Sequence, residues 1–111
     1  PRFVMISSVG ADPAAEDDGG FGTYLRAKGQ ADSDLTQSEL DYTIIRPGPL
    51  TDDPGTGEIT VGPDIERGPV TRDDVAATAA AVLEIDAMIG LTLDLRGGGE
   101  PVYLALAELE N

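Results

Sequence analysis

The sequence has no cysteine, no histidine and no tryptophan, and Lys28 is the single lysine among its seven basic residues. Without cysteine, the chain can form no disulfide framework and offers no thiolate ligand to a metal. Without histidine, it cannot hold a Ser-His-Asp triad or a Cys-His pair, and most zinc sites are excluded. No apolar run approaches the roughly 20 residues that span a bilayer. We therefore expect a soluble, cytoplasmic protein without a resident metal.

Negative charge is what the sequence has in excess. The 111 residues include 21 acidic and 7 basic side chains, which gives a net charge of -14. Such a surface repels phosphates, so neither nucleic acid nor an anionic membrane is expected as a partner. Many acids with a single lysine favour a halophilic source, because the Debye length falls to about 3 Å in 1 M salt. An ordinary acidic protein is the alternative.

Segments typical of strands alternate with segments typical of helices along the chain. We expect strands at 3–6, 41–46 and 91–95, helices at 23–39, 71–85 and 101–109, and a short strand at 58–61. Thr23 and Thr71 are expected to cap the first two helices, and Pro101 to begin the third. This order implies right-handed βαβ crossovers and a parallel sheet. The predicted class is α/β, with three main strands forming half of a doubly wound, Rossmann-like sheet.

The chain opens without methionine and directly on an apolar run of strand type, Phe3 to Ile6. We therefore expect residues 1–111 to be the C-terminal part of a single domain whose N-terminal half is missing. The strand at 3–6 would then have an open edge of unpaired backbone groups. The missing half, or another copy of the chain, is expected to cover that edge.

Polar and small residues follow the predicted strands where a ligand is expected. Ser7 and Ser8 follow the first strand, and Pro47 and Gly48 follow the second. In open α/β sheets the ligand crevice lies outside the carboxyl ends of the strands. Tyr24 lies four residues before Lys28, so both side chains share one face of the helix between these strands. A chance pair on a solvated helix face is the alternative interpretation.

Taken in order, these motifs resemble the short-chain dehydrogenase/reductase superfamily. The order is a strand with Ser-Ser-x-Gly at 7–10, Tyr-x-x-x-Lys at 24–28, and a strand with Arg-Pro-Gly at 46–48. Together with the runs at 41–51 and 71–76, they look most like its atypical branch, the NmrA-like and nucleoside-diphosphate-sugar epimerase-like proteins. The glycine-rich dinucleotide fingerprint of the superfamily is absent, which the resemblance explains if it lies in the missing upstream half.

The resemblance implies a role for each of these residues. Tyr24 would be the general acid/base at a substrate carbonyl or hydroxyl, and Lys28 would bind the nicotinamide ribose and favour the tyrosinate. Ser8 would hydrogen-bond the substrate oxygen, with Ser7 as the alternative. Pro47 and Gly48 would lie against the nicotinamide. The implied activity is that of an NAD(P)-dependent oxidoreductase or sugar-nucleotide epimerase acting on a small molecule, with NADP or NAD as cofactor. A noncatalytic NAD(P)-binding or sensing module is the alternative, and this piece alone is expected to be inactive.

Other features of the sequence have structural interpretations. We interpret the acid pairs as solvated surface rather than as cation sites; these pairs are Asp17-Asp18, Asp52-Asp53 and Asp73-Asp74. Gly97-Gly98-Gly99 is interpreted as a closing turn rather than a phosphate loop. Arg46 reaches either an anionic substrate or a neighbouring acid.

Overall fold

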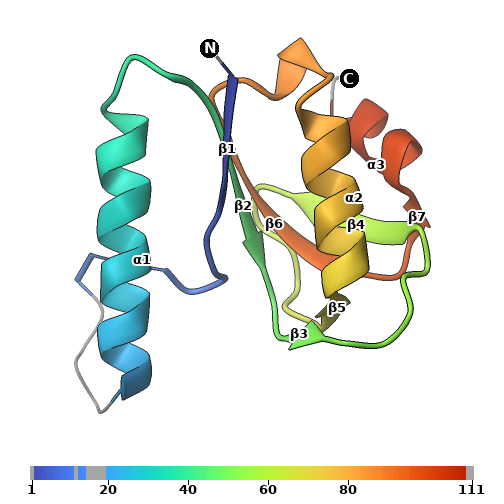
Figure 1. The fold of residues 1–111 in the computed structure, drawn as a ribbon, viewed down its shortest axis with the longest axis horizontal. Coiled ribbons are helices and arrows are strands. Elements are labelled where there is room, and N and C mark those ends of the chain that lie inside the picture. The colour runs from blue at the N-terminus through green and yellow to red at the C-terminus, as the bar shows by residue number, and fades with distance from the viewer. Residues whose placement is uncertain (1, 12, 15–19, 110–111) are drawn as a thin grey trace.

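A computed structural model describes residues 2–11, 13–14 and 20–109. Its sheet has five strands in the order β1-β2-β6-β4-β7 (Figure 1). These strands are β1 (Arg2–Ile6), β2 (Asp41–Pro47), β6 (Leu91–Gly97), β4 (Glu58–Gly62) and β7 (Glu100–Pro101). The helices are α1 (Gly20–Thr36), α2 (Arg72–Val82), α3 (Val102–Glu108) and the short 3-10 helix η1 (Asp86–Met88). Two further short strands, β3 (Leu50–Thr51) and β5 (Val70–Thr71), pair in parallel.

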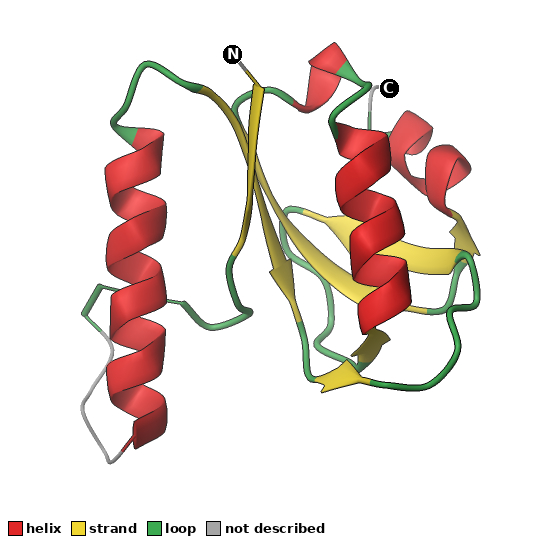
Figure 2. Cartoon of the chain, viewed as in Figure 1, coloured by secondary structure: helices red, strands yellow, loops and turns green. Residues whose placement is uncertain are grey.

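The α/β class and the parallel sheet are confirmed. β1 pairs in parallel with β2, and β2 pairs in parallel with β6. The sheet continues beyond these three strands, which the sequence did not predict. β4 lies antiparallel to β6, and β7 lies antiparallel to β4. The short strand expected at 58–61 is β4, which is one of the five strands of the main sheet (Figure 2).

The two faces of the sheet carry different layers. Side chains alternate between faces along a strand, so Ile45 points away from its neighbours Ile44 and Arg46. Ile45 belongs to the main apolar core, in which strand residues pack against α2 and α3. Arg46 contacts Asp32 of α1, which places α1 on the opposite face. The sheet is thus covered by helices on both sides, as expected for a doubly wound fold.

Helix boundaries depart from the predictions at several points. α1 begins at Gly20, so Thr23 lies inside the helix and is not its cap, and α1 ends at Thr36 rather than near residue 39. α2 begins as predicted: the Thr71 hydroxyl accepts a hydrogen bond from the Asp74 N–H at 3.0 Å. α2 ends at Val82, before residue 85. Pro101 is the N-cap residue of α3.

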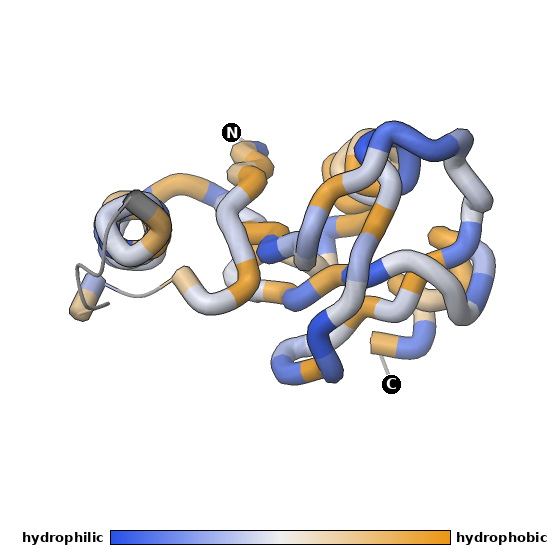
Figure 3. The backbone as a smooth tube through the Cα atoms, turned by 90° about the horizontal axis from the view of Figure 1, so that it is seen from below, coloured by the Kyte–Doolittle hydropathy of each residue, from blue (hydrophilic) through white to orange (hydrophobic). Residues whose placement is uncertain are grey.

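β1 is an edge strand of the described sheet, and α1 lies on the same side of the molecule. Among the residues that the structure describes, β1 pairs with β2 alone. α1 stands to that side, apart from α2 and α3 (Figure 1), and it is seen end-on in the turned view (Figure 3). Phe3 of β1 remains 44% exposed. None of the described helices is long and apolar enough to cross a membrane.

Candidate functional site

A cavity of about 460 Å³ lies at the carboxyl ends of the parallel strands and beside the first turns of α1. Its walls come from the β1 end, α1, the segment after β2, the loop before β5 and the start of α2. The lining residues are Ser8, Phe21, Tyr24, Gly48, Pro49, Leu50, Arg67 and Arg72. Three residues singled out in the sequence, Ser8, Tyr24 and Gly48, are therefore brought together.

Tyr24 and Lys28 lie on one face of α1, as their spacing predicts. The Lys28 Nζ stands 5.8 Å from the centroid of the Tyr24 ring. Phe21 stacks on Tyr24, with the two ring centroids 6.2 Å apart and the ring planes 18° apart. Tyr24 is 45% exposed, so its phenol is accessible to a ligand in the cavity.

Lys28 also ties α1 to the first strand. Its Nζ donates a hydrogen bond to the backbone carbonyl oxygen of Ile6 at 3.2 Å. An ammonium has three donors, so this contact leaves others for a ligand hydroxyl. That donor set fits a ribose. Lys28 would hold the nicotinamide ribose of NAD(P), and the cofactor would supply hydride chemistry when bound.

The two serines after β1 point to different places. Ser8 lines the cavity, and its Oγ donates weakly to the carbonyl oxygen of Val9 at 3.3 Å. Ser7 is buried, and its Oγ donates to Asp32 Oδ2 at 2.9 Å. Of the two alternatives that the sequence left open, the structure places Ser8 beside Tyr24 and uses Ser7 in a buried hydrogen bond.

Pro47 and Gly48 differ in their position relative to the cavity. Pro47 is a buried residue of β2 and does not line the cavity, whereas Gly48 does. A Cβ at Gly48 would collide with the carbonyl oxygen of Gly68. Glycine is therefore required where the chain leaving β2 passes the loop before β5.

A buried polar network, which the sequence analysis missed, connects this region. Asp32 of α1 accepts hydrogen bonds at 2.9 Å from the Ser7 hydroxyl and from Arg46 Nε. Of the two partners considered for Arg46, an anionic substrate or a neighbouring acid, the structure shows the acid. Asp32 lies four residues after Lys28, so positions 24, 28 and 32 share one helix face. This spacing was the sequence signal that could have placed Asp32 near the site.

A second missed carboxylate fixes the loop between β3 and β4. Asp74 is buried, and its carboxylate accepts hydrogen bonds from the N–H groups of Thr56 and Gly57 at 2.9 to 3.1 Å. Burial raises the pKa of Asp74, but hydrogen bonds from Gly57, Thr56 and Thr71 outweigh it, so the pKa lies below its usual value. The interpretation of the acid pairs as solvated surface is wrong for this residue.

The remaining acid pairs differ from one another. Asp52 forms an exposed ion pair with Arg72, and Asp73 accepts a hydrogen bond from the Gly55 N–H. Asp17-Asp18 lies outside the described residues. Within the described part of the chain, no three side chains of metal-binding type gather at one point. Gly97-Gly98-Gly99 ends β6 and turns into β7, with Gly98 and Gly99 at positive φ.

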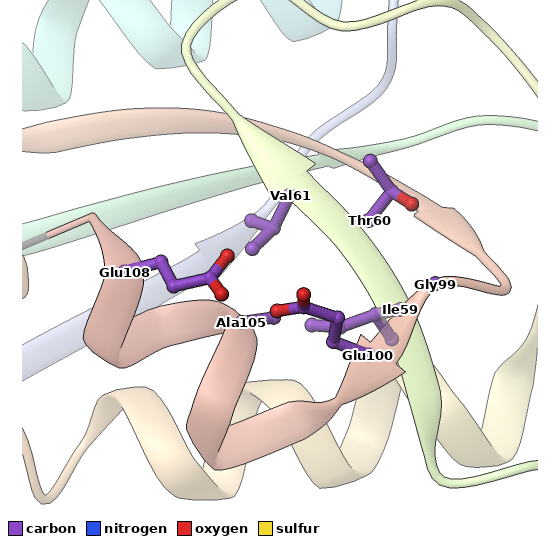
Figure 4. A pocket seen from close by; sticks show the side chains of 7 residues that line it. All are labelled: Ile59, Thr60, Val61, Gly99, Glu100, Ala105 and Glu108. Atoms are coloured by element: carbon purple, nitrogen blue, oxygen red, sulfur yellow. The ribbon is translucent and has the colours of Figure 1, made fainter.

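A cavity of about 430 Å³ lies away from this site, between β4 and α3 (Figure 4). The carboxyl groups of Glu100 and Glu108 point toward one another across it. A hydrogen bond with Glu108 raises the pKa of Glu100, and burial and repulsion between the two charges act in the same direction. No residue of the Tyr24 cavity lines this second one.

Known proteins resemble this chain across nearly its whole length. A family profile described as NAD(P)H-binding matches residues 1–86. An uncharacterized sugar epimerase, YhfK of Bacillus subtilis, is 41% identical over 97% of this chain and 50% of its own length. A putative NAD-dependent epimerase/dehydratase from Bacillus halodurans has 40% identity and a TM-score of 0.83, covering 95% of this chain and 50% of that one. The oxidoreductase ylbE from Lactococcus lactis has 32% identity and a TM-score of 0.84, covering 96% and 51%.

The chain belongs to the NAD(P)H-binding family, and its fold is that of Rossmann-type NAD(P)-binding proteins. The family inferred from the sequence motifs is thereby confirmed, as is an NAD(P) cofactor. The chain spans about half the length of the relatives described above.

Proposed function

We propose that this chain supplies the proton-transfer half of an NAD(P)-dependent oxidoreductase or sugar-nucleotide epimerase-like enzyme. The observation that carries the proposal is the shared cavity, which Ser8 and Tyr24 line together. The Lys28 Nζ lies over the Tyr24 ring, 5.8 Å from the ring centroid. A phenol and a hydroxyl facing one space can act on one substrate oxygen.

Each side chain has a task in the proposed step. The Tyr24 hydroxyl gives its proton to the carbonyl oxygen of the substrate as that oxygen gains negative charge, and takes a proton from the alcohol in the reverse direction. The Ser8 hydroxyl donates a hydrogen bond to the same oxygen. The ammonium of Lys28 stabilises the tyrosinate that remains after the transfer.

The other half of the domain belongs to the same proposal. We propose that the dinucleotide fingerprint lies in a segment N-terminal to this chain, and that this segment, or another copy of the chain, covers the open edge of β1. Support comes from the side of β1 on which no other described strand pairs, and from relatives about twice as long. Light scattering on residues 1–111 alone should show self-association. A monodisperse monomer would contradict this part.

The test uses the full-length protein, NADPH and a broad panel of carbonyl compounds. Tyr24→Phe should lower kcat by about 10²- to 10⁴-fold, the usual contribution of general acid/base catalysis, and Lys28→Arg should also lower it. Tyr103→Phe is the matched control, because Tyr103 lies on α3 and bonds Glu84 instead. Calorimetry should show NADPH binding intact in Tyr24→Phe.

Two outcomes would refute the catalytic assignment. Turnover that Tyr24→Phe leaves unchanged would remove the residue from the mechanism. NADPH binding without turnover of any compound in the panel would favour the noncatalytic binding or sensing module.

A further inference from the structure

Positive charge is concentrated at the Tyr24 cavity in a chain that has little of it. The sequence has seven basic residues against 21 acidic ones. Two of the seven, Arg67 and Arg72, line this single cavity. The long-range field of a chain with net charge -14 repels anions, so an anion is attracted here only by local contacts.

Arg67 differs from the other arginines in its bonding. Hydrogen bonds or ion pairs occupy the side chains of four arginines: Arg2 with Val82, Arg46 with Asp32, Arg72 with Asp52 and Arg96 with Glu66. Within the described part of the chain, the Arg67 side chain makes no hydrogen bond or ion pair. Its guanidinium therefore offers its donors to a ligand.

The loop that carries Arg67 is fixed on both sides. Before it, the Glu66 carbonyl oxygen accepts a hydrogen bond from Arg96 at 3.2 Å. After it, Gly68 packs against Gly48, and the Pro69 carbonyl oxygen accepts from the Gly97 N–H at 2.9 Å. A charge on an anchored loop loses less entropy when it binds a ligand than one on a free loop.

The other walls of the cavity suit the body of a small organic molecule. Phe21 and Tyr24 present stacked rings, and Leu50 adds an aliphatic surface. The volume of about 460 Å³ lies within the range of small-molecule sites. A guanidinium binds carboxylate and phosphate oxygens through two parallel hydrogen bonds.

We propose that the substrate of this cavity is a carbonyl compound with a carboxylate or phosphate group, and that Arg67 binds that group. The inference rests on the proposed function, because it assigns a substrate class to the cavity of Tyr24. Arg72 contributes less, since it shares its charge with Asp52 at 2.8 Å.

The first measurement compares matched aldehydes on the full-length protein with saturating NADPH. para-Carboxybenzaldehyde is paired with its methyl ester, and para-formylphenyl phosphate with para-methoxybenzaldehyde, so that the two arms distinguish the carboxylate from the phosphate. At least one charged member should have the higher kcat/KM. Arg67→Gln should raise KM for that member about 10- to 100-fold, the usual value of a hydrogen bond to a charged group, and leave the neutral member unchanged.

Two variants control for charge. Arg67→Lys keeps the charge without the paired donors and should recover part of the lost affinity. Arg26→Gln removes an equal charge from α1 at a residue that does not line the cavity, and should leave the charged-to-neutral ratio unchanged.

The second measurement needs no turnover. Benzoate and phenyl phosphate, with benzamide as the neutral reference, are titrated calorimetrically into the protein saturated with NADP⁺. Anion binding that is lost in Arg67→Gln supports the inference even where no aldehyde is reduced, in which case the proposed function alone fails.

Two results overturn the inference and leave the proposed function intact. One is reduction of charged and neutral aldehydes with equal kcat/KM and equal response to Arg67→Gln. The other is weaker NADPH binding in Arg67→Gln with an unchanged charged-to-neutral ratio, which would assign the arginine to a cofactor phosphate.

Discussion

Asp32 shows how one buried carboxylate positions a helix. It accepts hydrogen bonds from Ser7 at the end of β1 and from Arg46 of β2, and so joins α1 to two strands. Tyr24 and Lys28 precede it on the same helix face. The orientation of the proposed acid/base toward the cavity therefore depends on a residue that does not line the cavity.

Asp32→Asn should lower the free energy of unfolding by about 1–3 kcal/mol, because a half-buried Arg46 loses its charged partner. The measurement is urea unfolding of the full-length protein. Asp34→Asn is the control: Asp34 lies on the same helix and bonds Gln30 at an exposed site, so a change within about 0.5 kcal/mol is expected. Equal effects of the two substitutions would show that the network adds nothing to stability.

Asp74 should make stability depend on pH in a defined direction. Its pKa is lowered in the folded state, so its stabilisation is present above the unfolded pKa near 4 and is lost as pH falls through the folded value. Asp74→Asn should cost about 1–3 kcal/mol at pH 7, since charged hydrogen bonds to Thr56 and Gly57 are weakened. The cost should shrink below about pH 4.

The control for Asp74 is its neighbour. Asp73→Asn alters a single exposed hydrogen bond, to the Gly55 N–H at 3.2 Å, and should have a small effect at every pH. Melting curves from pH 3 to 7 test both variants. If the loss of stability in Asp74→Asn does not vary with pH, the loss comes from packing and not from the charge of Asp74.

At the scale of elements, apolar runs predicted the long strands and helices well. β1, β2 and β6 follow from continuous apolar segments, and α2 follows from the Thr71 cap. β3 and β5 have two residues each, too few to show a period, so only their mutual pairing defines them. The roles of Asp74 and Arg67 depend on loops returning to the sheet, and local sequence does not contain that information.

The junction of β7 and α3 contains an acid pair whose repulsion can be relieved. Glu108 raises the pKa of Glu100 in the folded state. The protonated Glu100 therefore stabilises the fold below its unfolded pKa, and this contribution is lost as pH rises through its folded pKa. Glu108→Gln should therefore raise the melting temperature at pH 7, and the gain should disappear near pH 4. A variant that melts no higher than the parent at pH 7 would show that the two carboxylates do not repel in solution.

At the scale of the whole molecule, the acids are not neutralised by pairing. Ion pairs in the described part of the chain include two at the surface, Arg72 with Asp52 and Arg96 with Glu66. Surface pairs contribute about 0–1 kcal/mol each, and seven bases cannot match 21 acids. Folding must therefore bring like charges together, against a repulsion that only solvent ions screen.

Stability should consequently rise with NaCl or KCl, with the largest change below about 1 M, where the Debye length falls from about 10 Å to 3 Å. Each kcal/mol of repulsion removed should raise the melting temperature by about 4–8 °C for a domain of this size. Thermal melts at several salt concentrations measure this rise in melting temperature. Sodium sulfate separates screening from general salting-out, because screening saturates while the strengthening of apolar burial continues with concentration. A melting temperature that stays flat or falls up to molar NaCl would rule out the halophilic interpretation and leave the charge of -14 without an explanation.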